Sequence, residues 1–285
     1  MMRRTLRQPT ARDQPPVPLE WKSVLMLVIL SVGGVGMFAW PLIVPASAGG
    51  TAGAGAPLMF VVLLPLLIFL VLAQISERGM DAKALAMLGV LSAVNAALRP
   101  LGAGTGGVET VFFLLILAGR VFGAGFGFVL GCLSMFASAL LTAGVGPWMP
   151  FQMLASGWVG MGAGLLPDRA FGRPIRGKAE VAMLIGYGIV AAYLFGALMN
   201  LWFWPFIAGP AAGGTTDLSY IPGGPLGENL GRFFWYTLIT STAVWDTGRA
   251  VTNTVLLALV GSPVLAVFRR TVRRARFNPV VTFEV

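Results

Sequence analysis

Residues Val111 to Leu141 read VFFLLILAGRVFGAGFGFVLGCLSMFASALL, and Arg120 is the only charged residue among them. A transmembrane helix needs about 20 mostly apolar residues, and shorter helices persist when neighbours bury them. We therefore expect a short apolar helix over 108–118, a break at Arg120 and a full span over 121–142. The whole chain is 56% hydrophobic and 11% charged, about half the charged share of a soluble domain. The sequence thus predicts an all-α integral membrane protein.

The same length rule predicts eight membrane spans, which alternate with short polar or Gly/Pro-rich links. They cover residues 23–44, 58–75, 84–101, 108–118, 121–142, 148–166, 180–207 and 233–268. This map divides the chain into four parts. We expect an N-terminal tail over 1–22, a transmembrane hairpin over 23–75, a six-helix core over 84–268 and a basic tail over 269–285. A polar loop, Thr215 to Arg232, precedes the last span.

The net charge of +9 comes from 20 Lys and Arg against 11 Asp and Glu. All of the basic residues except Arg99, Arg232 and Arg249 lie in links on one predicted side. Because Lys and Arg concentrate on the cytoplasmic side of membrane proteins, this distribution predicts an even number of spans with both termini in the cytoplasm. It also argues against a nucleic-acid surface.

Several catalytic and cofactor-binding classes are disfavoured by composition. The chain has no His and a single Cys, Cys132, so the commonest metal ligand and acid–base group is missing. No phosphate-binding G-x-x-x-x-G-K-[ST] motif is present. The G-x-G-x-x-G at Gly102 to Gly107 lies between two spans and does not follow a strand. We therefore expect no catalytic residue, no metal and no cofactor, although an intramembrane enzyme using Asp246, Glu109 or Glu228 stays an alternative.

Small residues repeat every fourth position in two spans, at Gly123, Gly127 and Gly131 and again at 188, 192 and 196. This spacing lets helix backbones approach closely. It indicates bundle packing and carries no chemistry of its own.

Ionisable and amide side chains at membrane depth are costly and usually face a bundle interior or a pathway. Asp246, Arg249 and Asn253 fall on one face of the last predicted span, which Thr242 and Trp235 extend. They form either a structural ion pair or the wall of a substrate cavity. Three further candidates lie where the third span ends and the fourth begins. They are Asn95, Arg99 and Glu109.

Aromatic and amide residues gather at the predicted outer ends of the sixth and seventh spans and in the loop before the last one. We expect them to form a polar, aromatic cup closed by a mobile loop. The candidates for substrate binding are Trp148, Gln152, Asn200, Trp204, Tyr220 and Asn229, together with Trp202, Asp217 and Glu228 nearby.

Three segments resemble the substrate-binding (S) component of an energy-coupling factor (ECF) vitamin transporter. One is the A-x-x-x-A pattern at Ala93 and Ala97, with Ala82 and Ala86 upstream. The others are GPWMPFQMLASGWVGMGAGLLP from Gly146 and DTGRAVTNTVLLALVGSPVLAVFRR from Asp246. The resemblance covers about the last 200 residues, and the first two helices are additional to its six-helix pattern.

This resemblance implies a protein in the cell membrane of a prokaryote that captures a vitamin from outside the cell. Transport would require a transmembrane T component and two ATP-binding subunits, and the small face with Ala82, Ala86, Ala93 and Ala97 would contact the T component. Tryptophans and a long loop suit a large, flat ligand. A cobalamin-like corrinoid is favoured slightly over riboflavin, and a thiamine precursor stays open. The alternative is a self-sufficient secondary transporter, although the repeated halves common in that class are not evident.

Overall fold

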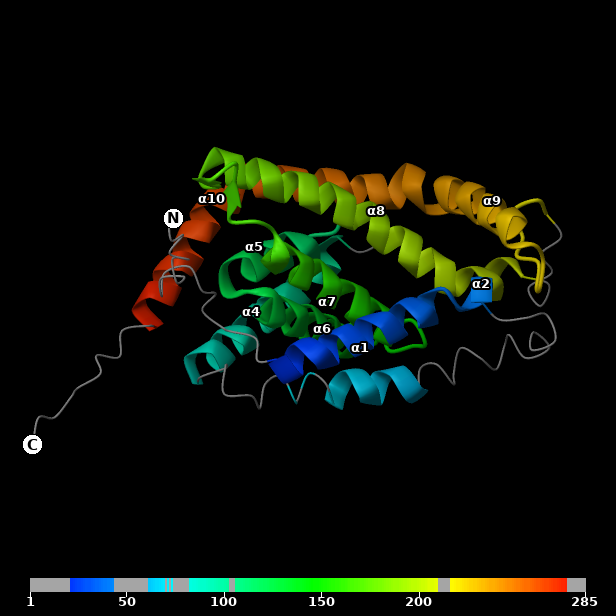
Figure 1. Cartoon of the computed structure of the whole chain (residues 1–285), viewed down its shortest axis with the longest axis horizontal. Coiled ribbons are helices and arrows are strands. Elements are labelled where there is room, and N and C mark those ends of the chain that lie inside the picture. Colours follow the sequence, from blue (N-terminus) through cyan, green and yellow to red (C-terminus); the bar gives the residue numbers. More distant parts are fainter. Residues whose placement is uncertain are drawn as a thin grey trace, which may run out of the picture.

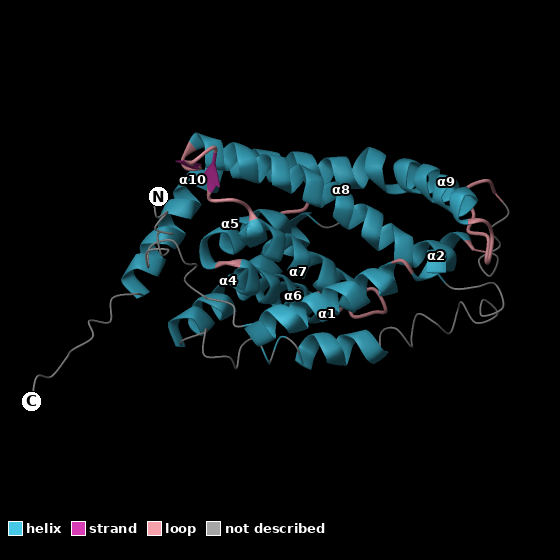
Figure 2. Cartoon of the chain, in the orientation of Figure 1, coloured by secondary structure: helices cyan, strands magenta, loops and turns pink. Residues whose placement is uncertain are grey.

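The computed structural model describes residues 21–43, 61–69, 71, 73, 82–102, 106–209 and 216–275, with only the backbone of Ala275. Almost all of them are helical (Figure 2). Several predictions lie outside these residues: the tails over 1–20 and 276–285, the turn between the first two spans and Gly104.

The described chain runs through helices α1, α2 and α4–α10, a π-helix labelled η3 and one pair of short strands. Residues 61–69 are helical as well. The bounds are α1 Trp21–Phe38, α2 Trp40–Ile43, α4 Ala82–Gly102, α5 Val111–Phe122, α6 Ala124–Leu141, α7 Met149–Leu165, β1 Arg169–Ala170, β2 Arg173–Pro174, α8 Lys178–Ala208, α9 Leu226–Thr237, η3 Leu238–Asp246 and α10 Thr247–Ala275.

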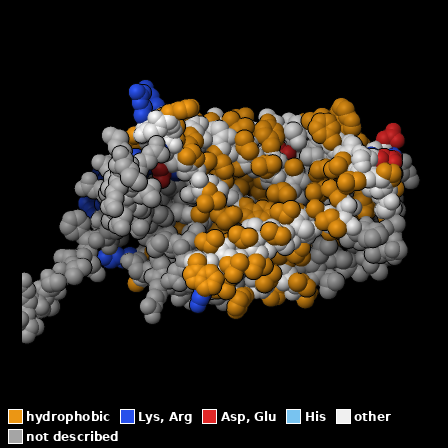
Figure 3. Space-filling view, in the orientation of Figure 1, with side chains coloured by type: hydrophobic (Ala, Val, Ile, Leu, Met, Phe, Trp, Pro, Cys, Tyr) orange, Lys and Arg blue, Asp and Glu red, His pale blue; other side chains and the backbone are white. Residues whose placement is uncertain are grey.

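Helices α5, α6 and α7 form the centre of the bundle, and nearly every side chain of α5 is buried. Helix α4 packs on α6, whereas α8 runs beside α10 (Figure 1). Among the described residues, five helices are long and apolar enough to cross a membrane: α1, α4, α6, α8 and the continuous α9–η3–α10 helix. Large apolar side chains cover much of the outer surface (Figure 3). The coarse prediction of an all-α, multi-pass membrane protein is therefore supported.

Two predicted boundaries are wrong. Helix α5 continues past Arg120 and ends at Phe122, because Gly123 makes the turn with φ 105°, a conformation that only glycine adopts readily. The polar loop expected to reach Arg232 ends at Pro225, where α9 begins. Pro225 is the N-cap residue and has an extended ψ of 134°, and an i,i+4 ion pair between Glu228 and Arg232 stabilises the first turns.

Close backbone contact between α6 and α7 confirms the packing role predicted for Gly127 and Gly131. A Cβ atom at Gly127 would overlap the carbonyl oxygen of Gly160, and one at Gly160 would overlap the carbonyl of Gly127. A Cβ at Gly131 would likewise overlap the backbone of Ser156. Because backbone atoms cannot move aside, these glycines set the distance between the two helices.

Most of the Lys and Arg side chains that the structure describes lie at one end of the bundle, which we call the basic end (Figure 3). It comprises the β1–β2 hairpin, the start of α8 and the last turns of α10. Here the buried carboxylate of Glu180 accepts hydrogen bonds from Arg120 at 2.8 Å and Arg269 at 2.6 Å. Arg120 also pairs with Asp168 at 2.9 Å. This cluster joins α5, α8, α10 and the α7–α8 link.

Replacing Gly127 with Leu should destabilise the fold by more than about 3 kcal/mol, the upper end of ordinary overpacking, because the side chain would meet α7 backbone. Gly186→Leu on α8 is the matched control, since nothing lies within 4 Å of a Cβ placed there. Thermal denaturation of the two purified variants provides the comparison. Equal losses of stability would contradict the assigned α6–α7 contact.

Candidate functional site

The α9–α10 helix widens into the π-helix η3, Leu238–Asp246. The amide of Thr247 donates to the carbonyl of Thr242, five residues earlier, and its hydroxyl donates to the same oxygen at 2.7 Å. The Thr240 hydroxyl also bonds to a backbone carbonyl, that of Tyr236. Such Ser and Thr back-bonds weaken regular α-helical pairing. Since π-helical turns are rare and frequently occur at functional sites, η3 marks a candidate site.

A cavity of about 560 Å³ lies between α8 and the α9–η3–α10 helix. The part of its lining that α8 supplies lies in the half of α8 remote from the basic end, where α8 diverges from α9 in Figure 1. The walls combine aromatic rings with a few polar groups. They are Phe195, Gly196, Met199, Asn200, Phe203, Ile207, Tyr236, Thr240, Ser241, Trp245, Asp246 and Arg249.

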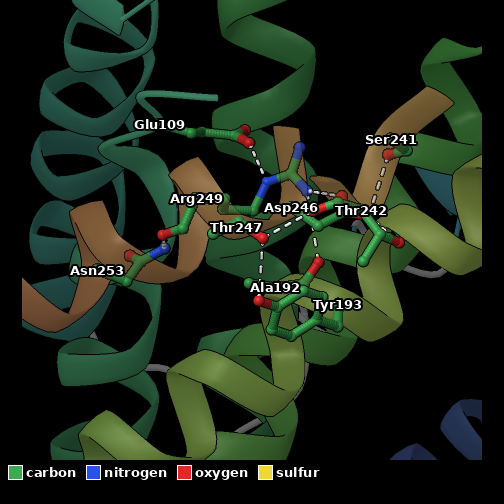
Figure 4. Close-up of polar contacts among 9 residues, drawn as sticks. All are labelled: Glu109, Ala192, Tyr193, Ser241, Thr242, Asp246, Thr247, Arg249 and Asn253. Atoms are coloured by element: carbon green, nitrogen blue, oxygen red, sulfur yellow. Dashed lines mark hydrogen bonds and ion pairs between the residues drawn. The ribbon is translucent and has the colours of Figure 1, made fainter. Parts of the chain in front are cut away.

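Arg249 forms a buried charge network beside this cavity (Figure 4). Its Nε donates to Glu109, which lies just before α5, and its Nη1 donates to Asp246 at 2.9 Å and to the Ala192 carbonyl at 3.4 Å. The guanidinium also lies 4.8 Å from the ring centroid of Phe195, a cation–π distance. The Asp246–Arg249 ion pair is therefore present, and Glu109 is a second acidic partner of Arg249.

The carboxylate of Asp246 is fully buried and accepts two further hydrogen bonds, from Ser241 at 3.0 Å and Thr242 at 3.3 Å. A Cβ atom at Gly196 would overlap this carboxylate. Glycine at position 196 therefore allows α8 to pass directly over the charge. Tyr193, one turn earlier, is held by a 3.1 Å hydrogen bond to Thr247.

Two amides near the network have polar atoms without a partner among the described residues. Asn253 donates to the Arg249 carbonyl at 2.8 Å, but its Oδ1 is buried and unbonded. The Nδ2 of Asn200, which lines the cavity, is also buried and unbonded. Buried polar groups are normally hydrogen-bonded, so Asn200 is a suitable group to meet a ligand.

The candidates Asn95, Arg99 and Gln152 lie elsewhere. Arg99 donates to Gln152 at 2.9 Å and so joins α4 to α7. Asn95 is completely buried, and neither its nitrogen nor its oxygen has a hydrogen-bond partner among the described residues. Trp148 is exposed and bonds to the nearby Gly144 carbonyl. None of the four lines the cavity.

Trp204, Tyr220 and Asn229 pack the end of the bundle and do not line the cavity either. Trp204 donates to the Leu218 carbonyl at 2.9 Å and contacts the Tyr220 ring with centroids 5.3 Å apart. Asn229 makes two hydrogen bonds to the backbone of Ile221. Burial raises the pKa of Tyr220 above its ordinary value. The residues predicted to form one cup thus lie in different places: Trp204, Tyr220 and Asn229 pack together at the end of the bundle, whereas Asn200 lines the α8–η3 cavity.

Sequence reasoning missed most of the aromatic and apolar wall. On α8 it consists of residues at four-residue spacing, Phe195, Met199, Phe203 and Ile207, a pattern that could have been noticed around Asn200. On the other wall, the π-helix changes the register. Trp235, expected to share a face with Asp246, is exposed and outside the lining, whereas Tyr236 belongs to it.

The fold and the site define a multi-pass helical membrane protein with a cavity beside a buried charge network. Residues 79–212, a little less than half of the chain, match the family model described as ECF-type riboflavin transporter, S component. This match confirms, for residues 79–212, the resemblance to ECF S components predicted from the sequence, and that family consists of transporter subunits, not enzymes. The match includes α4–α8 with Asn200 but not Asp246 or Arg249. Comparisons with curated proteins and with solved structures gave no match.

Arg249→Met should cost about 3–5 kcal/mol of stability, because it leaves two acidic groups, one of them fully buried, without their counter-ion. Arg232→Met is a matched control, since Arg232 belongs to a more exposed pair with Glu228 and should lose under about 1 kcal/mol. The midpoint of denaturant-induced unfolding in detergent distinguishes the two. A loss for Arg249→Met no larger than for the control would show that the network does not stabilise the fold.

Proposed function

We propose that this protein is the substrate-specificity subunit of an ECF-type importer and that it captures a flavin, riboflavin or a close relative, from outside the cell. The observation that carries the proposal is the α8–η3 cavity, since the family-matched segment supplies one of its walls. The name of the matching family refers to a riboflavin transporter. In this proposal the protein resides in a prokaryotic cell membrane, and the positive-inside rule puts the basic end in the cytoplasm.

The chemistry of the cavity suits a flat, uncharged heteroaromatic molecule. Phe195, Phe203, Tyr236 and Trp245 can stack on or edge against such a ring system. The free amide N–H of Asn200 can donate to a ring carbonyl, while the carboxylate of Asp246 can accept from an imide N–H or a hydroxyl. Arg249 is already engaged by two carboxylates and a carbonyl, so it does not require an anionic ligand.

Cavity size supports the smaller of the two ligands favoured by the sequence. A volume of about 560 Å³ lies within the range typical for drug-sized ligands. A corrinoid with its nucleotide arm is much larger than this class, whereas a flavin belongs to it. We therefore propose riboflavin, and not a corrinoid, as the ligand of this cavity.

The family implies a T component and two ATP-binding subunits as partners, and the exposure of α4 supports a docking face for the T component. Ala82, Ala86, Ala93 and Ala97 are all exposed. The additional helix α1 packs elsewhere: Trp158 of α7 donates to Ser31 at 2.9 Å, and Phe38 packs edge-on against Phe151 at 5.1 Å. The N-terminal helix thus leaves the alanine face uncovered.

The protein purified alone should bind riboflavin, and Asn200→Leu or Asp246→Asn should each raise the Kd about tenfold through loss of a buried hydrogen bond to the ligand. Trp148→Leu, outside the cavity, should leave the Kd unchanged. Titration followed by quenching of flavin fluorescence measures all four proteins. Absence of binding by the wild type, or equal effects of Trp148→Leu and Asn200→Leu, would contradict the proposed site.

Ala93→Leu should leave riboflavin affinity unchanged but abolish ATP-dependent uptake, because the larger side chain prevents close approach of the T component. Val190→Leu, at an exposed position of α8, should impair neither. Binding assays and uptake by cells expressing the complete transporter measure the two properties. Normal uptake by Ala93→Leu would contradict the proposal that this face of α4 contacts the T component.

A further inference from the structure

A second cavity lies at the basic end, between the start of α8 and the last turns of α10. Its volume is about 250 Å³, and it is lined by Gly177 and Glu180 on one side and by Ser262, Leu265, Ala266, Arg269 and Arg273 on the other. We call it the basic-end groove. It is remote from the α8–η3 cavity, and neither the ion network of Arg249 nor the proposed flavin site includes any of its residues.

The groove is amphiphilic along its length. The α10 residues that line it have spacings of three and four, so they form one face of the helix. From Ser262 to Arg273 this face extends roughly 16 Å at 1.5 Å per residue. Its deeper part is small and apolar, with Leu265 and Ala266, whereas the part nearest the helix end carries Arg269 and Arg273. A ligand that fits this gradient has an apolar portion and an anionic head.

Positive charge remains in excess at the mouth of the groove. Arg120 and Arg269 both engage Glu180, and Arg120 also engages Asp168, so these four side chains balance one another. Arg273 is exposed and has no ion-pair partner among the described residues, and the same holds for Arg176 and Lys178, which flank Gly177 of the groove. The excess charge favours an anion at this position.

The β1–β2 hairpin, at the same end of the bundle, has an exposed aromatic residue at its tip. Its strands pair Arg169 with Pro174 and Ala170 with Arg173. At the tip, Phe171 is fully exposed and has a φ of 49°, followed by Gly172 at φ 76°. An exposed aromatic side chain between arginines is suited to the interface between lipid headgroups and acyl chains.

We propose that the basic-end groove binds an anionic phospholipid of the adjacent leaflet. Its phosphate lies against Arg273 and Arg269, and its glycerol and upper acyl chain lie along Leu265, Ala266 and Ser262. Basic pockets between transmembrane helices on the cytoplasmic side bind such headgroups. A lipid fits better than free phosphate because the α10 side of the groove continues past Arg269 along three uncharged residues, Ala266, Leu265 and Ser262. This inference does not depend on the proposed transport function.

Native mass spectrometry of the full chain, purified alone and supplied with phosphatidylglycerol or phosphatidylcholine, tests the proposal. The wild type should retain phosphatidylglycerol preferentially, and Arg273→Gln should weaken that retention about fivefold, as expected for one basic residue near the surface. Arg274→Gln is the matched control, because it removes the same charge from the neighbouring position, which is rotated away from the groove. It should have little effect.

Ala266→Phe provides a test without a change of charge, since it fills the groove and should also reduce retention of phosphatidylglycerol. Equal retention of both lipids, equal losses for Arg273→Gln and Arg274→Gln, or full displacement by inorganic phosphate would overturn the proposal. The proposal would also be overturned if Arg273→Gln left lipid retention unchanged but weakened assembly with the ATP-binding subunits. That result would identify the surface as a protein contact.

Discussion

The buried guanidinium of Arg249 is the constraint on which the rest of the site depends. A charge inside a helical bundle is tolerated only when it is fully paired. Here the partners come from three places far apart in the sequence: Glu109 before α5, the Ala192 carbonyl of α8 and Asp246 at the end of η3. Satisfying one side chain therefore fixes the relative positions of these elements, and the position of the cavity follows.

Glycines and the π-helix make this arrangement sterically possible. Gly196 leaves room for the Asp246 carboxylate, and Gly107, with φ 81°, lies directly against the backbone of Trp245. A side chain at either position would push a helix away from the network. The wider turn of η3 then places Ser241 where its hydroxyl reaches the same carboxylate. Close approach on one side and a widened helix on the other together define the cavity.

Local sequence signals predicted much of this fold but only part of the site. Apolar runs located most of the described helices, and the three-residue spacing of Asp246 and Arg249 made an ion pair one of the two alternatives for this face. The contact of Arg249 with Glu109 was not predictable, because nothing local indicates which of several distant charges will meet. Likewise, apolar residues in a membrane helix can face lipid, core or cavity, so the four-residue spacing of Met199 and Phe203 marks one face of α8 but does not say what that face contacts. Trp204 and Tyr220 were expected to bind substrate, but they pack against each other.

We propose that the protein alone holds a flavin between α8 and η3. An experimental structure of the purified chain with riboflavin tests it most directly. Density for the ring system is expected among Phe195, Tyr236 and Trp245, within hydrogen-bonding distance of Asn200 and Asp246. Density for the ligand in contact with Arg99 and Gln152 instead, or an empty α8–η3 cavity in a protein that binds riboflavin, would contradict it.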